Sequence, residues 1–338
     1  MKIIQNEIPV NKIPFVEPPI IPDNALFFDI ETTGFSARSS YLYLVGCALK
    51  KGEYINIVQY LAENRTEEEV LLTSFFEYAS GTDKYISFNG DQFDIPYLLE
   101  KAKKFNIDSK DMFLNSYDIY KEIKPYKNIL SLANLKQKTI EDFLKIDRYD
   151  QYSGGELINV FFNFEKTKEK ADEHLLLLHN YEDVLGMIKL ISITKYFNAL
   201  TNDFEFKKTE TVTSKDYYGN EVTELIIRCK LRYTLPTSIR YRKEYISLYV
   251  EDDNLVISTP IENGLCKYPH LDIKNYVYLK NEDMAILKEM ATFVDKDSKE
   301  KATYSNCYSK FNASNDIIND SVSMKKYVET ALMFLKTK

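Results

Sequence analysis

The chain has 338 residues, of which 44% are hydrophobic and 28% are charged. This balance is ordinary for a globular protein and excludes a collagen-like, a largely disordered or an acidic-tail protein. Its length predicts roughly two domains at about 150 residues each. Acidic residues outnumber basic residues by 51 to 44, which argues mildly against a protein that holds nucleic acid by charge alone.

The cysteines and the N-terminal segment indicate the expected compartment. The cysteines are far apart in the sequence: Cys47, Cys229, Cys266 and Cys307. With no CxxC pair we expect no cysteine zinc site, and scattered thiols are typical of a reduced, cytoplasmic protein. Residues 1–22 lack the apolar core of a signal peptide, and their Pro-rich piece at 13–19 predicts an extended arm packed against the body. No apolar stretch of about 20 residues is present, so we expect no membrane contact.

Strand and helix signals alternate along residues 23–198. Apolar or alternating runs predict strands at 25–30, 41–50, 54–61, 84–88 and 112–117. Amphipathic runs predict helices at 66–79, 95–105, 130–144 and 168–197. A hairpin followed by strands that alternate with helices is typical of a mixed α/β sheet flanked by helices.

The pattern changes after about residue 200. Turn signals predict two hairpins, one of 211–217 with 222–233 and one of 245–250 with 255–259. Helices are expected at 281–294 and 323–336. We therefore predict an extended arm over 1–22, an α/β domain over 23–198 and an α+β accessory domain of unknown role over 199–338.

The first informative motif is Phe28-Asp29-Ile30-Glu31-Thr32-Thr33-Gly34, at the end of the first predicted strand. Residues two apart in a strand share a face, so Asp29 and Glu31 project together while Phe28 and Ile30 face the core. Two acids at the end of a buried strand repel each other, and a cation between them relieves that repulsion. A pair of solvated strand-end acids is the alternative.

Two further motifs carry acids. Asp94 stands at the start of a predicted helix, where a simple N-cap is the alternative role. On the late helix, His179 and Asp183 lie one turn apart on the same face. A surface His–Asp pair is the alternative there.

In this order, the motifs Asp29-x-Glu31-Thr-x-Gly34, Asn89-x-x-x-Phe93-Asp94 and His179-x-x-x-Asp183 resemble those of the DEDD (DnaQ-like) 3′–5′ exonuclease superfamily. That superfamily has a ribonuclease H-like fold. The segment Ser153-Gly154-Gly155-Glu156, taken with the His179 motif, is most similar to the YprB-type ribonuclease H-like domain. The resemblance covers about residues 22–198.

The resemblance implies a two-metal site. Asp29, Glu31, Asp94 and Asp183 match the family's four carboxylates, which hold two divalent cations. Asp29 would bridge both cations, Glu31 and Asp183 would complete one site, and Asp94 would support the other, partly through water. Hard carboxylate oxygens suit Mg²⁺ or Mn²⁺, and paired metals activate an attacking water and stabilise the leaving 3′ oxygen.

His179 departs from the family pattern. Family members carry Tyr four residues before the last Asp or His five residues before it. Here His179 stands four residues before Asp183, and Leu178 stands five before it. We expect His179 to orient or deprotonate the attacking water.

Two groups of residues are candidates for binding nucleic acid. Thr32, Thr33 and Gly34 follow the acids where the family's chain wraps the terminal nucleotide, and Asn89 and Phe93 are placed to contact a sugar or a base. In the C-terminal region, basic residues interleaved with tyrosines are suited to phosphates and base stacking. This basic cluster comprises Arg228, Lys230, Arg232, Arg240, Arg242 and Lys243. Core packing of Phe93, and solvation of a hairpin face by the basic residues, are the alternatives.

These features predict a metal-dependent 3′–5′ exonuclease that hydrolyses single-stranded 3′ ends of DNA or RNA. One alternative is a ribonuclease H-like scaffold that binds nucleic acid without cleaving it. The other is a structure-specific endonuclease of related fold. Nothing in the sequence identifies a reader of the 2′-hydroxyl, so DNA and RNA are not distinguished.

Overall fold

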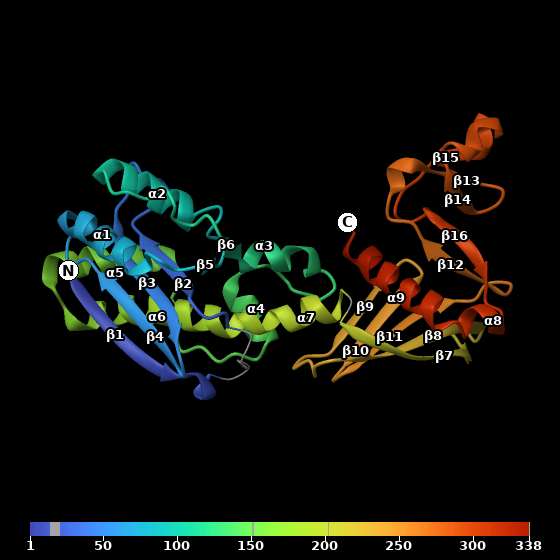
Figure 1. The fold of residues 1–338 in the computed structure, drawn as a ribbon, viewed down its shortest axis with the longest axis horizontal. Coiled ribbons are helices and arrows are strands. Elements are labelled where there is room, and N and C mark those ends of the chain that lie inside the picture. Colours follow the sequence, from blue (N-terminus) through green and yellow to red (C-terminus); the bar gives the residue numbers. More distant parts are fainter. Residues whose placement is uncertain (14–20, 151, 202, 338) are drawn as a thin grey trace. The chain divides into compact units, whose positions relative to one another are not determined.

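The structure is a computed structural model that describes residues 1–13, 21–150, 152–201 and 203–337 (Figure 1). The chain divides into two compact units. Unit 1 contains Met1–Lys124 and Asn134–Ile193, and unit 2 contains Pro125–Ala133 and Thr194–Lys338. Most of the Pro-rich piece expected to form an arm, residues 14–19, lies outside the described residues.

A six-stranded mixed sheet forms the centre of unit 1, in the order β1-β4-β3-β2-β5-β6. β1, β4, β3 and β2 pair antiparallel, and β5 and β6 extend the sheet in parallel. The strands are β1 Lys2–Pro9, β2 Ala25–Thr32, β3 Leu42–Lys51, β4 Tyr54–Leu61, β5 Lys84–Ser87 and β6 Ser116–Asp118. Residues 2–9, which the sequence analysis placed in the arm, form β1, one of the two edge strands of the sheet.

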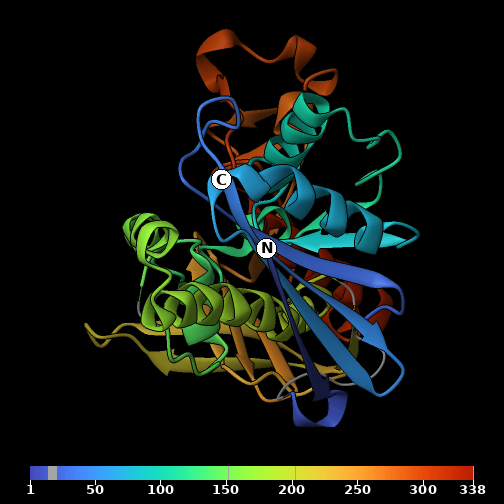
Figure 2. The ribbon, with the colours of Figure 1, turned by 90° about the vertical axis from the view of Figure 1, so that its left-hand side faces the viewer.

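Helices cover both faces of this sheet (Figure 2). α1 (Glu68–Ala79) and α2 (Asp94–Phe105) share a hydrophobic core with one face. α6 (Lys170–Leu190) contacts β2, β3 and β4 on the other face, and α5 (Gly154–Thr167) packs against α6. The mixed α/β sheet flanked by helices that the sequence predicts is confirmed.

Some helices of unit 1 differ from the sequence prediction. The helix expected at 130–144 is wrong in length, because only α4 (Gln137–Phe143) is helical there. α5 and the short α3 (Ile119–Ile123) were not predicted. α5 begins with a capping box between Ser153 and Glu156. That signal is legible in the sequence, but two consecutive glycines follow Ser153 and favour a loop.

Unit 2 is built on a five-stranded antiparallel sheet in the order β7-β8-β11-β10-β9. The strands are β7 Phe204–Lys215, β8 Glu221–Leu231, β9 Ile239–Lys243, β10 Ile246–Glu251 and β11 Asn254–Pro260. Both predicted hairpins are confirmed as β7–β8 and β10–β11. The helix expected at 323–336 is confirmed as α9 (Ser321–Lys336), and α7 (Thr194–Ala199) opens the second segment of the unit.

The helix expected at 281–294 is wrong. Asp283 has a φ of 49°, in the left-handed region, and turns the chain between two short strands. Its carboxylate accepts a hydrogen bond from Tyr278 Oη at 2.6 Å and pairs with Lys310 at 2.8 Å, which stabilises the turn. The remaining elements are β12 Leu265–Pro269, β13 Tyr276–Leu279, β14 Met284–Leu287, β15 Lys299–Lys301, β16 Tyr308–Asn312 and α8 Asn315–Ile318.

Two observations concern the whole chain. Its four cysteines are buried and free of disulfide bonds. In the described part of the chain, no helix combines the length and the apolar character that crossing a membrane requires.

Candidate functional site

Two of the predicted ligands lie on the central strand β2. Phe28 and Ile30 enter the core shared with α1 and α2. Because side chains alternate along a strand, Asp29 and Glu31 point to the opposite face, which α6 covers. The pairing of β2 with β3 shifts register between Glu31 and Thr32, so regular pairing ends directly after the acids.

Asp29 is held from α6. Asn180 donates a hydrogen bond from Nδ2 to Asp29 Oδ2 at 3.0 Å, and Gln59 Nε2 donates to Asn180 Oδ1 at 3.0 Å. Gly46 of β3 lies opposite Asp29, and a Cβ atom there would come within 2.1 Å of Asn180 Oδ1. The glycine therefore permits the close approach of α6 that holds Asp29.

Asp94 is the first residue of α2 and is 5% exposed. Its Oδ1 accepts a hydrogen bond from the backbone N–H of Ile30 at 3.2 Å. This bond links the start of α2 to the acid-bearing strand. The N-cap residue of α2 is Phe93, which makes no side-chain capping bond. The carboxylate of Asp94 is thus directed at β2, and Asp94 does not occupy the N-cap position of α2.

The gathering of these carboxyl groups raises their pKa values. Burial is the largest cause for Asp29, Glu31 and Asp94, and repulsion from neighbouring acids, Asp183 among them, adds to it. The pKa of Asp94 rises to about 7 from an ordinary value of 3.8. A cation lowers the cost of such buried negative charge. Four convergent carboxylates with hard oxygen donors fit a divalent metal.

His179 and Asp183 share one face of α6, in agreement with their spacing. His179 Nε2 is 3.1 Å from Asp183 Oδ2 and 3.4 Å from Glu31 Oε1. One potential ligand atom from each of these three residues lies within 4.8 Å of the other two. The structure therefore brings His179 and the four predicted acids together in unit 1.

Asp150 and Arg148, which the sequence analysis did not identify, surround His179 and Asp183. Asp150 Oδ2 is 2.7 Å from His179 Nδ1. Arg148 Nη2 is 2.7 Å from Asp183 Oδ1 and 3.2 Å from Asp150 Oδ2, and Nη1 is 3.4 Å from Glu141 Oε2. Both residues precede α5 in an irregular segment without periodicity, so no sequence signal connected them with α6.

Aromatic and polar residues lie beside the acids. Phe35, a third residue missed from the sequence, follows the Thr32-Thr33-Gly34 turn and is 93% exposed. Its ring lies edge-on to Phe93, with centroids 6.0 Å apart. Asn89 has a φ of 63° and donates its backbone N–H to Asp118 Oδ1 at 2.8 Å. Because this exposed ring follows the turn after the acid-bearing strand and packs against Phe93, Phe35 is a candidate for contact with a ligand.

Most of the predicted basic cluster lies on one exposed face of the unit 2 sheet. Arg240 pairs with Tyr249, Tyr249 with Val256, and Val256 with Arg228, so these residues form a row across the sheet. By the same alternation, four members of the cluster share this face: Arg228, Lys230, Arg240 and Arg242. Arg232 lies after the end of β8, with its guanidinium 5.8 Å from the ring centroid of Tyr233.

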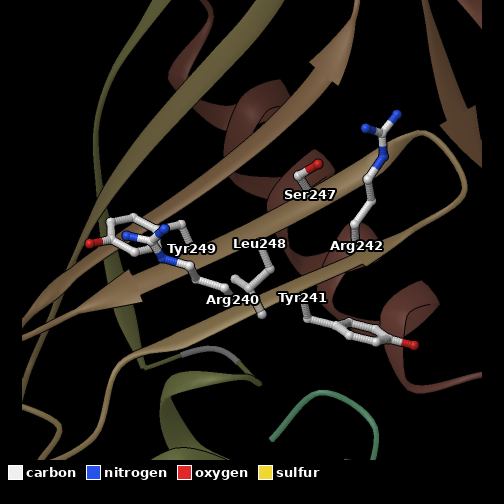
Figure 3. A pocket seen from close by; sticks show the side chains of 6 residues that line it. All are labelled: Arg240, Tyr241, Arg242, Ser247, Leu248 and Tyr249. Atoms are coloured by element: carbon white, nitrogen blue, oxygen red, sulfur yellow. The ribbon is translucent and has the colours of Figure 1, made fainter. Parts of the chain in front are cut away.

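Arg240 and Arg242 border an open hollow of about 540 Å³ on β9 and β10. Figure 3 shows the guanidinium of Arg240 over the ring of Tyr249, at 4.7 Å from its centroid, with Arg242 next to Ser247. Arg242 donates from Nε to the backbone oxygen of Glu244 at 3.2 Å. Neither arginine forms an ion pair with any described residue.

The other members of the basic cluster are engaged within the protein. Arg228 pairs with Glu210 at 2.6 Å, and Lys230 pairs with Asp253 at 2.6 Å. Lys243 lies on the opposite face, where its Nζ donates to the backbone oxygen of Thr337 at 2.5 Å near the end of α9. The structure thus places Lys243 in helix capping and away from the exposed face.

Comparison with known families matches residues 26–194 to the model described as the RNase_H superfamily. The match begins in β2 and ends just after α6, so it contains every acid of the site. The comparison with curated proteins gave no match.

The comparison with solved structures matched two kinds of nucleic-acid enzyme. The family B DNA polymerase of the archaeon Pyrobaculum calidifontis is 16% identical with a TM-score of 0.41, covering 52% of this chain and 25% of the polymerase. This chain therefore spans a quarter of that polymerase. E. coli exonuclease I in complex with a dT13 oligonucleotide is 9% identical with a TM-score of 0.35, covering 93% of this chain and 74% of the exonuclease.

Proposed function

This chain belongs to the RNase_H superfamily through residues 26–194, and on that premise we propose that it is a metal-dependent nuclease that shortens nucleic acids from their 3′ ends. The observation that carries the proposal is the convergence of Asp29, Glu31, Asp94 and Asp183 from β2, α2 and α6. Burial and mutual repulsion raise the pKa values of the first three. A purely structural site has no need for so much convergent negative charge.

The four acids would hold two Mg²⁺ or Mn²⁺ ions. Bound divalent ions supply Lewis acidity toward a phosphoryl oxygen and lower the pKa of water. The protein contributes the position of each carboxylate. Asn180 holds Asp29, and the Ile30 N–H holds Asp94. These fixed donors keep the carboxylates oriented before substrate arrives, which is the condition for efficient charge stabilisation.

Residues beside the acids would receive the end of the strand. The exposed ring of Phe35, supported edge-on by Phe93, offers a surface on which a base can stack. Thr32 Oγ1 donates to the backbone oxygen of Gly34 at 2.9 Å, and this bond stabilises the turn that carries Phe35. A stacking surface accepts any base, so these contacts would select a free strand end and not a sequence.

The exposed face of the unit 2 sheet would bind strand outside the catalytic site. Neither the Arg240 nor the Arg242 guanidinium forms an ion pair with any described residue, so both would be available to phosphates, and the Tyr249 ring under Arg240 adds an aromatic group to this face. This arrangement of cations and an aromatic ring is typical of surfaces that bind single strands.

An Asp29→Asn variant tests the proposal. The substitution keeps the size of the side chain and one acceptor oxygen but removes its charge, so Mn²⁺-dependent shortening of a single-stranded oligonucleotide should fall by about 1,000-fold or more, a loss of roughly 4 kcal/mol in transition-state stabilisation. The control is Asp91→Asn in the adjacent turn, where the Asp91 carboxylate accepts from Ser116 Oγ at 2.9 Å and pairs with Lys121 at 3.2 Å. Equal activity of wild type and Asp29→Asn would refute the assignment.

The choice of substrate separates the alternatives. Oligonucleotides labelled at the 5′ or the 3′ end report the direction of shortening, and matched DNA and RNA report the sugar preference. Cleavage of a circular strand would favour the endonuclease alternative. Tight binding of the oligonucleotide without cleavage, in the presence of either Mg²⁺ or Mn²⁺, would favour the non-catalytic scaffold.

A further inference from the structure

We propose that His179 is itself a metal ligand, which binds through Nε2 together with Glu31 and Asp183, and that Asp150 positions it by accepting a hydrogen bond from Nδ1. This inference rests on the proposed function, because it concerns the same metal site. It replaces the water-orienting role that the sequence predicts for His179. It also assigns the site a preference for Mn²⁺ over Mg²⁺.

The spacing of the three atoms carries the proposal. Metal–ligand bonds of about 2.1 Å at right angles put neighbouring ligand atoms about 3 Å apart. His179 Nε2 lies 3.1 Å from Asp183 Oδ2 and 3.4 Å from Glu31 Oε1. These separations match two edges of one coordination shell.

The hydrogen-bond partner of Nδ1 determines whether Nε2 of His179 can offer a lone pair to a metal ion. The carboxylate of Asp150 accepts hydrogen bonds only, so at 2.7 Å it requires a proton on Nδ1. In the neutral ring, the lone pair of Nε2 then faces two carboxylate oxygens. A positive charge among the three atoms, either a proton on Nε2 or a bound metal ion, makes this arrangement favourable, and an acceptor on the far nitrogen is how metal-binding histidines are usually oriented.

Arg148 completes the support of this site. It binds Asp183 Oδ1 at 2.7 Å and so leaves Oδ2 directed at His179. It also pairs with Asp150 at 3.2 Å and with Glu141 at 3.4 Å. Arg148 therefore partly offsets the negative charge of Asp150 and Glu141, which are not proposed ligands. It also restricts the orientation of Asp183, which is a proposed ligand.

The chemistry of the donor set gives the metal preference. Mg²⁺ prefers oxygen ligands, whereas first-row transition ions accept an imidazole nitrogen more readily. A site with two carboxylates and one imidazole should therefore bind Mn²⁺ more tightly than Mg²⁺.

Pulsed EPR of the full chain with substoichiometric Mn²⁺ tests the proposal directly. A directly bound imidazole gives a nitrogen hyperfine coupling, which should change when the histidines are labelled with ¹⁵N. The coupling should vanish in His179→Ala and persist in His174→Ala, whose imidazole is exposed on the same helix. Bound Mn²⁺ without nitrogen coupling in the wild type would overturn the proposal, and so would coupling that survives in His179→Ala.

Calorimetric titration with Mn²⁺ tests the positioning role of Asp150. Asp150→Asn should raise the Kd for Mn²⁺ by about 10- to 100-fold, the usual cost of losing the partner of a metal-bound histidine. Because both carboxylate ligands remain, the Kd for Mg²⁺ should rise less. An equal rise for both ions would overturn this role and assign Asp150 to general stability.

The two proposals fail in different ways. Hydrolysis by a protein whose bound Mn²⁺ shows no nitrogen coupling refutes the ligand role and leaves the nuclease intact. Nitrogen coupling in a protein that hydrolyses neither DNA nor RNA supports the ligand role and refutes the nuclease.

Discussion

Three acids of the unit 1 site each have their own hydrogen-bond donor. Asn180 donates to Asp29, the Ile30 N–H donates to Asp94, and Arg148 pairs with Asp183. These partners orient the carboxylates but do not remove their mutual repulsion. That repulsion, together with burial, keeps the pKa values of Asp29 and Asp94 raised. In the metal-free protein the site is therefore a source of instability, which a bound cation should reverse.

The pH dependence of stability follows from Asp94. Its pKa is about 7 in the folded, metal-free protein against an ordinary 3.8. Between these values the folded state holds a proton that the unfolded chain has released, so stability falls as pH rises through this window. Asp94→Asn removes this contribution and should raise the Tm at pH 8 in EDTA by about 2–4 °C for each kcal/mol regained.

Thermal melting of both proteins in EDTA between pH 4 and 8 checks this prediction. The difference in Tm should shrink as the pH approaches 4, and Mn²⁺ should stabilise the wild type more than the variant. A lower Tm for Asp94→Asn at pH 8 would show that the charged carboxylate stabilises the metal-free fold.

Phe35 should contribute to binding and not to stability. Its side chain is 93% exposed, so Phe35→Ala removes little buried surface and should leave the Tm unchanged. Stacking is worth about 1–3 kcal/mol per base, so KM for an oligonucleotide should rise by roughly 5- to 150-fold. The matched control is Phe293→Ala in unit 2, a ring that is 98% exposed. Similar KM values for the two variants would remove Phe35 from the binding site.

At the scale of elements, the site depends on how closely α6 approaches β3. A Cβ at Gly46 would come within 2.1 Å of Asn180 Oδ1 and 2.9 Å of Val184 Cγ2. A second glycine, Gly186, has the same role on α6 itself, since a Cβ there would lie 2.1 Å from Glu141 Oε1. Both glycines provide space for polar side chains that support the site.

Gly46→Ala should therefore weaken metal binding. The methyl group would displace Asn180 from Asp29, and loss of such supporting contacts costs about 10- to 100-fold in metal affinity. Overpacking should also destabilise the fold by about 1–3 kcal/mol. Mn²⁺ titration and thermal melting measure the two effects. Gly155→Ala is the control, because its added Cβ would meet nothing within 4 Å; matching metal affinities in the two variants would contradict the account.

At the scale of the molecule, the proposed catalytic site and the proposed strand-binding face belong to different units. The acids lie in unit 1, whereas the exposed basic face lies in unit 2. Charges on unit 2 would therefore change the affinity for a long strand more than the chemistry at its end.

The salt dependence of binding tests this division. Arg240→Ala with Arg242→Ala should remove two phosphate contacts and reduce the slope of log K against log salt by about 1.4 for a single strand. Arg228→Ala with Lys230→Ala should change the slope less, because Glu210 and Asp253 already neutralise those residues. Fluorescence anisotropy in EDTA measures binding without cleavage. An unchanged slope in the first double variant would contradict strand binding by this face.

The sequence by itself predicted the features that lie within single elements. The period of a strand places Asp29 with Glu31, and the period of a helix places His179 with Asp183. These relations hold because backbone geometry sets the spacing of side chains whatever surrounds the element. The hairpins β7–β8 and β10–β11 were predicted for the same reason, since their turn residues lie between the runs they connect.

Only the tertiary structure decided which side chains from different elements contact one another. Asp150 is 29 residues from His179 in the chain, and it comes from an irregular segment in which no period constrains its direction. Lys243 and Arg242 are neighbours in sequence but lie on opposite faces of a sheet, so one caps α9 and the other is exposed. Contacts of this kind depend on how whole helices and strands pack against one another. The shape and charge of the packed surfaces determine which side chains meet, and the sequence next to each residue does not. The four acids could therefore be proposed from the sequence, whereas Asp150 and Arg148, which contact His179 and Asp183, could not.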